Sequence, residues 1–417
     1  MFVVLRNSWA LLLGMMLFMV GNGLQGTLLG VRGSSEGFST FELSVVMSGY
    51  FVGFLFGSQI APKMIKRVGH VRVFAALGSL ISAALIMFPV AVDPIAWTLL
   101  RIVIGFCFSG VYVTAESWLN DASTNETRGQ TLSIYLIVQM LGIVTAQYLL
   151  LLADPNGFIL FILPSILVSL AFAPILLSVA PAPAFGTTKV LPIRKLFEIS
   201  PTSCVGVFLV GAMFSGLFGM SAVYGSQQGF ELKQISAFVA SIYVGGMVLQ
   251  YPIGWLSDQM DRRKLAILTS VFGVGACVLA IVFAGNFYML LVMMFFVGGV
   301  ANPLYALLLA YANDYLDYED MAAASGGLIF ITGIGAIMGP IIMGQLMETI
   351  GPNGFFIFLA AMMAGVAGYG IYRSSIRDAP DTADNSNYSA VTPSTTAVAV
   401  EYAQEAWAES DEENTED

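Results

Sequence analysis

Long apolar runs recur along this sequence and constrain its fold more than any other feature. A hydrocarbon core about 30 Å thick needs about 20 helical residues to cross it. Because lipid offers no hydrogen bonds, a segment that crosses it has to satisfy its own backbone groups as a helix. The twelve predicted spans are residues 9–31, 43–63, 73–92, 95–118, 129–152, 157–179, 203–226, 234–257, 265–285, 287–312, 322–347 and 353–372.

Composition supports a bilayer as the main solvent. The chain is 57% hydrophobic and only 11% charged, whereas soluble domains carry about 25% charged residues. A soluble chain of this size would have to hide more apolar surface than its surface-to-volume ratio allows. The three cysteines, Cys107, Cys204 and Cys277, lie in apolar runs without metal-ligand spacing, so we expect them to pack. The expected fold class is an all-α membrane protein.

A proline-rich and basic segment, residues 181–201, interrupts the spans after the sixth. We therefore expect two six-helix bundles, residues 1–180 and 202–373, joined by this cytoplasmic linker. Residues 374–417 hold eleven acidic residues and one basic residue. They are too polar to form a core, so we expect an acidic, disordered cytoplasmic tail.

An internal repeat supports the two bundles independently of hydropathy. A shift of 193 residues superposes small and polar residues of the fourth span on those of the tenth. The superposed residues are Gly105, Tyr112, Asn120 and Asp121 on Gly298, Tyr305, Asn313 and Asp314. The repeat predicts two pseudo-symmetric six-helix bundles.

The distribution of Lys and Arg predicts the orientation. If the N-terminus is inside, fourteen bases lie on the cytoplasmic side and two, Arg32 and Lys233, lie outside. Lys and Arg are retained on the cytoplasmic side of membrane proteins. We therefore expect a multi-pass protein of a bacterial inner (plasma) membrane, with both termini in the cytoplasm.

The loop after the eighth span has the pattern G-x-x-x-D-x-x-D-R-R and resembles the signature loop of the major facilitator superfamily. The resemblance implies that the glycine lets two helices approach, an aspartate caps a helix N-terminus, and the bases pair with acids on adjacent helix ends. A charge run that merely anchors a helix end is the alternative. The residues predicted to act in gating in this half are Gly254, Asp258, Asp261, Arg262, Arg263 and Asp314.

The equivalent loop after the second span keeps its bases and lacks the acid. Glu116, at the inner end of the fourth span, is the nearest candidate acid for Arg67 or Arg72. We predict that such an ion pair helps to close the cytoplasmic side and so biases the inward and outward states. His70, the only histidine, is expected in a cytoplasmic loop, which leaves no histidine for a transmembrane proton relay.

Arg101 and Gly105 in the fourth span resemble the R-x-x-x-G motif of the superfamily. A guanidinium in hydrocarbon costs at least about 2.5 kcal/mol, so Arg101 is expected to face a cavity or an acceptor such as Gln25. It is either a structural strut or a ligand contact. If the substrate contributes, an anionic group such as a carboxylate fits best, because a guanidinium matches it with two parallel hydrogen bonds.

Other polar side chains recur near mid-membrane. In lipid such groups have to face protein or water. The superfamily resemblance implies a cavity between the halves, lined by spans one, four, seven and ten with help from five, eight and eleven. Each side chain alone fits an interhelical hydrogen bond as well as a ligand contact. The predicted substrate-binding residues are Asn22, Gln25, Arg101, Tyr112, Gln139, Tyr243, Asn302 and Tyr305.

The end of the fourth span, residues 115–121, and the Ala-Asn-Asp run at 312–314 resemble the YcaD-like branch of the superfamily. The resemblance covers roughly residues 5–373 and implies a secondary transporter that works by alternating access. One rival is a non-transporting sensor or assembly partner that acts through the acidic tail. Another is an intramembrane enzyme, for which the sequence has no paired catalytic groups.

The cargo and its coupling stay open at this point. No carboxylate lies deep in a predicted span, so proton symport rests on the superfamily alone and facilitated diffusion is its rival. The expected partners are a small-molecule substrate, protons as a candidate coupling ion, and the lipid bilayer. No cofactor, metal or nucleic acid is expected, and the chain is expected to act as a monomer.

Overall fold

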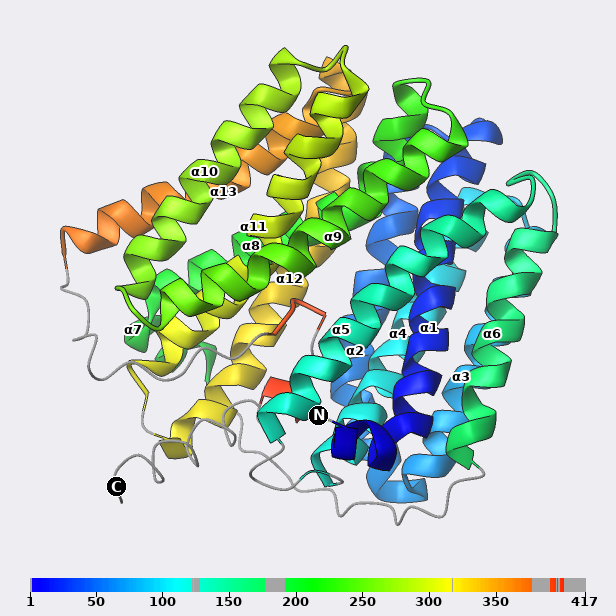
Figure 1. Cartoon of the computed structure of the whole chain (residues 1–417), viewed down its shortest axis with the longest axis horizontal. Coiled ribbons are helices and arrows are strands. Elements are labelled where there is room, and N and C mark those ends of the chain that lie inside the picture. The colour runs from blue at the N-terminus through cyan, green and yellow to red at the C-terminus, as the bar shows by residue number, and fades with distance from the viewer. Residues whose placement is uncertain are drawn as a thin grey trace.

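The computed structural model describes residues 2–121, 123, 128–176, 192–316, 318–376, 391–394, 396 and 398–400 (Figure 1). Within these residues every regular element is a helix. The elements are α1 (Phe2–Ser35), α2 (Thr40–Val68), α3 (His70–Met87), α4 (Pro94–Asp121), α5 (Arg128–Leu149), the 3₁₀ turn η2 (Leu150–Leu152), α6 (Ile159–Leu176), α7 (Ile193–Ile199), α8 (Pro201–Gln227), α9 (Leu232–Ser257), α10 (Arg262–Val282), α11 (Phe287–Asn313), α12 (Tyr318–Ile350) and α13 (Gly354–Ser374).

The helices reproduce the predicted spans. Within the described residues, eleven helices are long and apolar enough to cross a membrane, and α6 is a shorter apolar helix. Together they correspond to the twelve predicted spans. The predicted linker contains the short helix α7, and its residues 181–191 lie outside the described part of the chain. The chain is therefore a multi-pass membrane protein.

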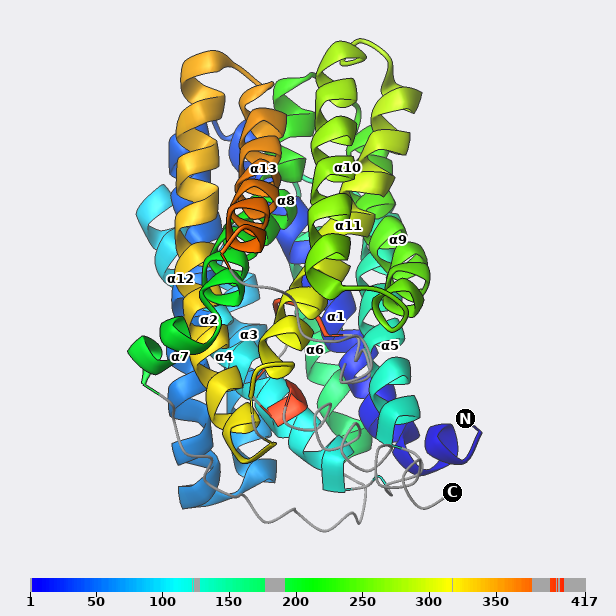
Figure 2. The same ribbon diagram turned by 90° about the vertical axis from the view of Figure 1, so that its left-hand side faces the viewer.

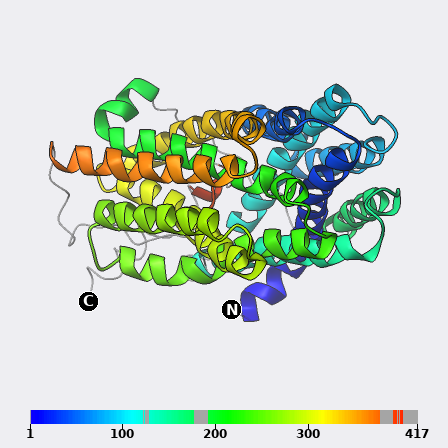
Figure 3. The same cartoon turned by 90° about the horizontal axis from the view of Figure 1, so that it is seen from above.

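The spanning helices form two groups with the same internal packing. In the first group α2 packs along α4, and α1 packs against α5 and α6. In the second group α9 packs along α11, and α8 packs against α12 and α13. Seen from above, the blue and cyan helices gather at one end of the molecule and the green to orange helices extend to the other (Figure 3).

One glycine in each group sets a close helix approach. A Cβ on Gly105 of α4 would lie 1.9 Å from the Tyr50 carbonyl oxygen of α2. A Cβ on Gly298 of α11 would lie 2.2 Å from the Ile242 carbonyl oxygen of α9. Because no side chain fits at such distances, only glycine lets these backbones touch. The two glycines are equivalent under the 193-residue repeat, and the carbonyl groups that they meet lie 192 residues apart.

The two groups touch on the side where α1 ends and α2 begins, here called the turn side. At the start of α2, Phe41 donates its backbone N–H to Glu348 Oε2 near the end of α12 (3.0 Å). Ser236 of α9 donates a hydrogen bond to the Gln147 carbonyl oxygen of α5. The opposite side, on which α1 begins, is called the N-terminal side.

The expectation of a disordered tail is wrong for one stretch. The described residues of 391–400 pack between the two groups, where Thr396, Ala399 and Val400 are 1%, 0% and 1% exposed. Figure 1 shows the red pieces of this stretch between the two groups, and Figure 2 shows the red helical piece in the part of the molecule where the N-terminus lies. Because 391–400 contains no charged residue, its burial avoids the cost that the acidic residues around it would impose. Residues 377–390 and 401–417 lie outside the described part of the chain.

Candidate functional site

A cavity lies between the two helix groups and encloses about 970 Å³, including the part that is open to solvent. Its lining comes from α1, α2, α4 and α5 of the first group and from α8, α9 and α11 of the second. Thr392 and Ser394 of the C-terminal stretch complete the described lining. Because the groups touch on the turn side, the mouth of the cavity faces the N-terminal side.

The cavity brings together most of the residues predicted to bind substrate. The six that line it are Asn22, Arg101, Tyr112, Gln139, Tyr243 and Asn302. Gln25 is buried and bonded to Arg101, and Tyr305 is fully buried within the second group; neither lines the cavity. The second span, as α2, contributes where the resemblance implied none, and the eleventh, as α12, does not contribute to the described lining.

Arg101 is the only charged residue in the described lining, and its side chain is held on several sides. One Nη atom donates to Gln25 Oε1 (3.1 Å), and the guanidinium carbon lies 4.7 Å from the centre of the Tyr50 ring. The other Nη atom lies 3.8 Å from Met47 Sδ. Cation–ring attraction strengthens where water is excluded, and Arg101 is 5% exposed. Its Nε has no hydrogen-bond partner in the described part of the chain, so a fixed cation keeps a donor available.

Aromatic rings form much of the remaining wall. Tyr50 accepts a hydrogen bond from Asn22 Nδ2 (3.4 Å), and Tyr112 lies on the same side of the cavity. On the facing group Tyr243 packs on Phe218 with ring centres 4.6 Å apart. Such a wall suits the apolar or aromatic body of a solute. Within the described residues, no group of three or more His, Cys, Asp or Glu side chains could hold a metal ion.

The sequence analysis missed Tyr50, although two signals pointed to it. Like Tyr112, it is a phenol inside a predicted span. The 193-residue shift also superposes it on Tyr243, which belongs to the predicted set. The lining residues Phe51 and Phe214 carry no comparable signal, because an apolar side chain in a span faces lipid, core or cavity equally well.

The expected ion pair of Glu116 with Arg67 or Arg72 is not formed in this structure. Glu116 is 2% exposed and accepts hydrogen bonds from Tyr135 Oη (3.3 Å) and from Thr396 Oγ1. Both arginines are exposed, at the end of α2 and the start of α3, and no ion pair links either to Glu116 among the described residues. The physical reason is that Glu116 faces α5 and the C-terminal stretch, whereas the arginines face outward.

The loop between α9 and α10 has the charge arrangement that the resemblance implied. Asp261 caps α10 by accepting hydrogen bonds from the backbone N–H groups of Arg263 (2.8 Å) and Lys264 (3.3 Å). Arg262 forms an ion pair with Asp314 just beyond α11, and the two side chains are 1% and 2% exposed. These contacts join α10 to α11, so they stabilise the second group from within.

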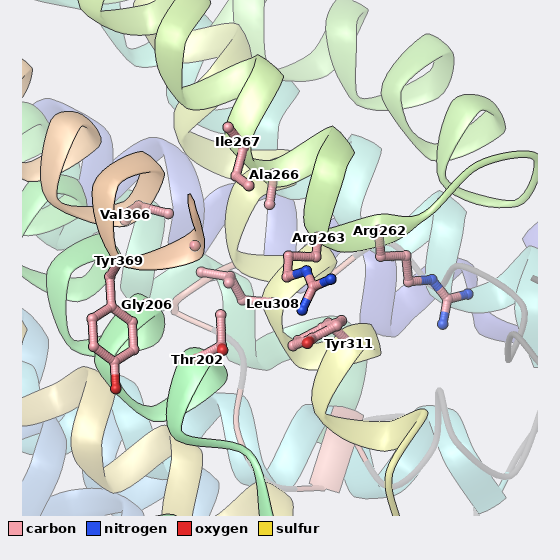
Figure 4. Close-up of a pocket in the computed structure, with 11 residues that line it drawn as sticks. Thr202, Gly206, Arg262, Arg263, Ala266, Ile267, Leu308, Tyr311, Val366 and Tyr369 are labelled. Carbon is pink, nitrogen blue, oxygen red and sulfur yellow. The ribbon is translucent and has the colours of Figure 1, made fainter. Parts of the chain in front are cut away.

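A small pocket lies beside this loop, inside the second group. Figure 4 shows Arg263 pointing toward Tyr311, whereas Arg262 points away from it. The pocket encloses about 340 Å³ and shares no lining residue with the central cavity. An Nη atom of Arg262 lies 3.9 Å from Asp258 Oδ1. Gly254 is buried in α9, one helical turn before Asp258. Of the predicted gating residues of this half, Arg262 and Arg263 line this pocket, and none lines the central cavity.

Known proteins share both the sequence pattern and the fold. A family model described as the Major Facilitator Superfamily matches residues 11–247 and 203–395. YE1530 of Yersinia enterocolitica, an uncharacterized MFS-type transporter, is 29% identical, with 87% of this chain and 93% of that protein covered. The MFS-type transporter YcaD of Salmonella paratyphi A is 24% identical, with 87% and 94% covered.

Solved structures agree on the fold. The crystal structure of a mutant of the nucleoside transporter NupG has a TM-score of 0.74 at 14% identity, with 87% of this chain and 99% of that chain covered. At this identity the likeness concerns the fold alone. The family match, in contrast, spans most of the sequence. The chain therefore belongs to the major facilitator superfamily of membrane transporters.

Proposed function

We propose that this chain is a secondary active transporter that carries a small solute across a bacterial inner membrane by alternating access. The observation that carries the proposal is the central cavity, which lies between two similar helix groups that touch on the turn side. Rocking one group against the other about such a site would close one mouth and open the other. With Lys and Arg as the guide to orientation, the N-terminal side is cytoplasmic and the conformation is inward-facing.

Orientation can be tested separately with a membrane-impermeant thiol reagent in intact cells. A cysteine at Ser35, on the turn side, should be labelled, and one at Ser374, at the end of α13, should not. The opposite pattern would reverse the proposed direction of the cavity and leave alternating access untouched.

For the solute we propose an organic anion with an apolar or aromatic body. Arg101 supplies the only charge in the described lining, and its Nε has no hydrogen-bond partner in the described part of the chain. A carboxylate is the group that a guanidinium recognises with two parallel hydrogen bonds. The rings of Tyr50, Phe218 and Tyr243 offer the surface for the rest of the molecule.

A thermal-unfolding screen of the purified protein tests the solute class first. A ligand that binds only the folded state raises the Tm, by an amount that grows with its concentration over Kd. We expect organic monoanions with an aromatic or aliphatic body to raise it, and amines and neutral sugars of similar size to leave it unchanged. Stabilisation by amines alone would rule out the proposed anion.

Flux into proteoliposomes then tests Arg101 itself. Arg101→Lys keeps the charge and loses the bidentate geometry, so we expect flux of the identified anion to fall by about tenfold or more, the equivalent of about 1.4 kcal/mol. Arg72→Lys, on the exposed start of α3, is the matched control and should retain wild-type flux. Wild-type flux in Arg101→Lys with normal folding would leave Arg101 as a structural strut.

Coupling to protons is part of the proposal, and facilitated diffusion is its alternative. Glu116 is a buried carboxylate whose described hydrogen-bond partners, Tyr135 and Thr396, are uncharged. A carboxylate buried in a membrane protein without a cation is a candidate proton carrier. Glu116→Gln should therefore abolish uptake driven by a pH gradient and keep counterflow, whereas a uniporter would show the same uptake with or without the gradient.

The rival function, a sensor or assembly partner acting through the acidic tail, predicts the opposite effect of truncation. Removing residues 380–417 from a transporter leaves solute flux in place. Removing them from a tail-dependent sensor abolishes its output. Flux measured on the truncated chain in proteoliposomes separates the two.

A further inference from the structure

The described residues of the stretch 391–400 lie at the mouth of the central cavity. Thr392 and Ser394 line the cavity itself, and Val391 is 1% exposed. Farther along the stretch, Thr396 donates a hydrogen bond to Glu116 of α4. Because α4 starts on the turn side and ends at Asp121, Glu116 lies toward the N-terminal side, where the mouth opens. The stretch therefore occupies the route between the cavity and the N-terminal side.

The chemistry of the stretch matches this position. Its side chains are small apolar groups and hydroxyls, and the Thr392 and Ser394 hydroxyls lie 3.0 Å apart. The neighbouring residues 401–417 are rich in Asp and Glu, which burial in a low-dielectric mouth would penalise. The uncharged segment 391–400 can therefore enter the mouth, whereas the acidic residues from Glu401 onward are disfavoured there.

The carboxylate of Glu116 gives the stretch a specific attachment point. One oxygen accepts from Tyr135 and the other from Thr396, so a side chain of the tail completes the hydrogen bonds of a buried acid. The backbone of Ala399 also interacts with this carboxylate. Leaving a buried acceptor unsatisfied is unfavourable, so this contact favours the occupied mouth.

We propose that 391–400 is a plug, an internal ligand of the cavity mouth that has to leave before solute can exchange on the N-terminal side. A tethered segment binds at a high effective concentration, in the millimolar range for short flexible linkers, so weak individual contacts are enough to keep the mouth occupied. The plug goes beyond the proposed transport function, because it concerns access to the cavity and not the identity of the solute.

Thiol labelling of the cavity tests the plug without a substrate. Gln139→Cys places a thiol in the cavity wall, and the native Cys107, Cys204 and Cys277 are 0% exposed and give a low background. The labelling rate with an impermeant maleimide is measured in vesicles that expose the N-terminal side. A chain ending at residue 390 lacks the plug, and a chain ending at Val400 keeps it and loses only the acidic end.

We expect the chain ending at 390 to be labelled about tenfold faster than the full chain, which corresponds to about 1.4 kcal/mol of plug binding. The chain ending at Val400 should be labelled at the rate of the full chain. Thr396→Val in the full chain should give a rate between those of the full chain and the chain ending at 390. Equal rates in all three chains, or an equal increase in both truncations, would overturn the plug. Either result leaves the Arg101 flux test intact, so the two proposals fail separately.

Discussion

The junction between α2 and α3 and the junction between α9 and α10 occupy equivalent places in the two helix groups, yet they are built differently. At the first, Gly69 precedes α3 with φ +86° and offers no side-chain cap. At the second, Asp261 caps α10 through two backbone N–H groups. Gly69 and Asp261 are both the N-cap residues of their helices, so the two junctions match in position and differ in whether a side chain caps the helix.

The charged residues beside the two junctions differ as well. Asp314 corresponds to Asp121 under the 193-residue shift, and Arg262 and His70 are the first residues of α10 and α3. The acid therefore interacts with an arginine in the second group and with a histidine in the first. Asp121 is exposed, whereas the Arg262–Asp314 pair is buried. The first junction also relies on packing, with the buried His70 ring 6.1 Å from the Trp118 ring. The halves thus share helix packing, and they differ in how the helix ends are held.

Breaking the buried ion pair should give the largest effect. Asp314→Asn leaves Arg262 buried opposite a neutral amide, and losing one partner of a buried pair costs about 3–5 kcal/mol. We expect a corresponding loss in the free energy of unfolding measured in mixed micelles. Asp121→Asn, the equivalent change in the first group, should stay within about 0.5 kcal/mol of wild type because the residue is exposed. Equal losses at both positions would contradict the comparison.

Substituting the glycine of the first junction should have the next largest effect. The backbone of Gly69, at φ +86° and ψ 159°, has a conformation that residues with a side chain rarely adopt. Gly69→Ala should therefore lower the free energy of unfolding by about 1–3 kcal/mol. Gly275→Ala on α10 is a control, because a Cβ there meets nothing within 4 Å. It should be neutral or stabilise by up to about 1 kcal/mol, since alanine favours a helix. Thermal unfolding of both variants is the measurement, and a neutral Gly69→Ala would show that the junction relaxes.

Removing the cap should give the smallest of the three losses. Asp261→Ala deprives two N–H groups at the start of α10 of their acceptor, which costs about 1 kcal/mol. Val68→Ala, an exposed position at the end of α2, removes no cap and should change the unfolding free energy by about 0.5 kcal/mol or less. Equal losses of unfolding free energy in the two alanine variants would contradict the difference between the junctions.

The sequence predicted the structural features that depend on position along the chain. Span length located the helices. The loop motif predicted that an aspartate caps a helix and that bases pair with acids on adjacent helix ends, and the structure assigns these roles to Asp261 and to Arg262 with Asp314. The need of Arg101 for an uncharged acceptor also led to Gln25, which the structure confirms. The cap is set by a short spacing, and the Gln25 contact by the absence of a carboxylate in the spans.

Predictions that depended on the direction of a side chain around its helix were less successful. Successive helical residues turn by about 100°, so a position near a helix end does not say which neighbour a side chain meets. Glu116 was assigned to the α2 end and instead faces Tyr135 and the tail. His70 was expected in a loop, and it is the buried first residue of α3. The contact between Thr396 and Glu116 joins residues 280 positions apart, beyond the reach of any local pattern.

A lone fixed cation in the cavity has an electrical consequence for a solute of opposite charge. Arg101 stays with the protein, so each proposed monoanion that crosses alone moves one negative charge through the membrane field. That movement is worth about 2.3 kcal/mol per 100 mV. An interior-negative potential therefore drives such an anion outward and opposes its entry. Accumulation inside against that potential would require at least one accompanying positive charge, and turnover without it would register as a current.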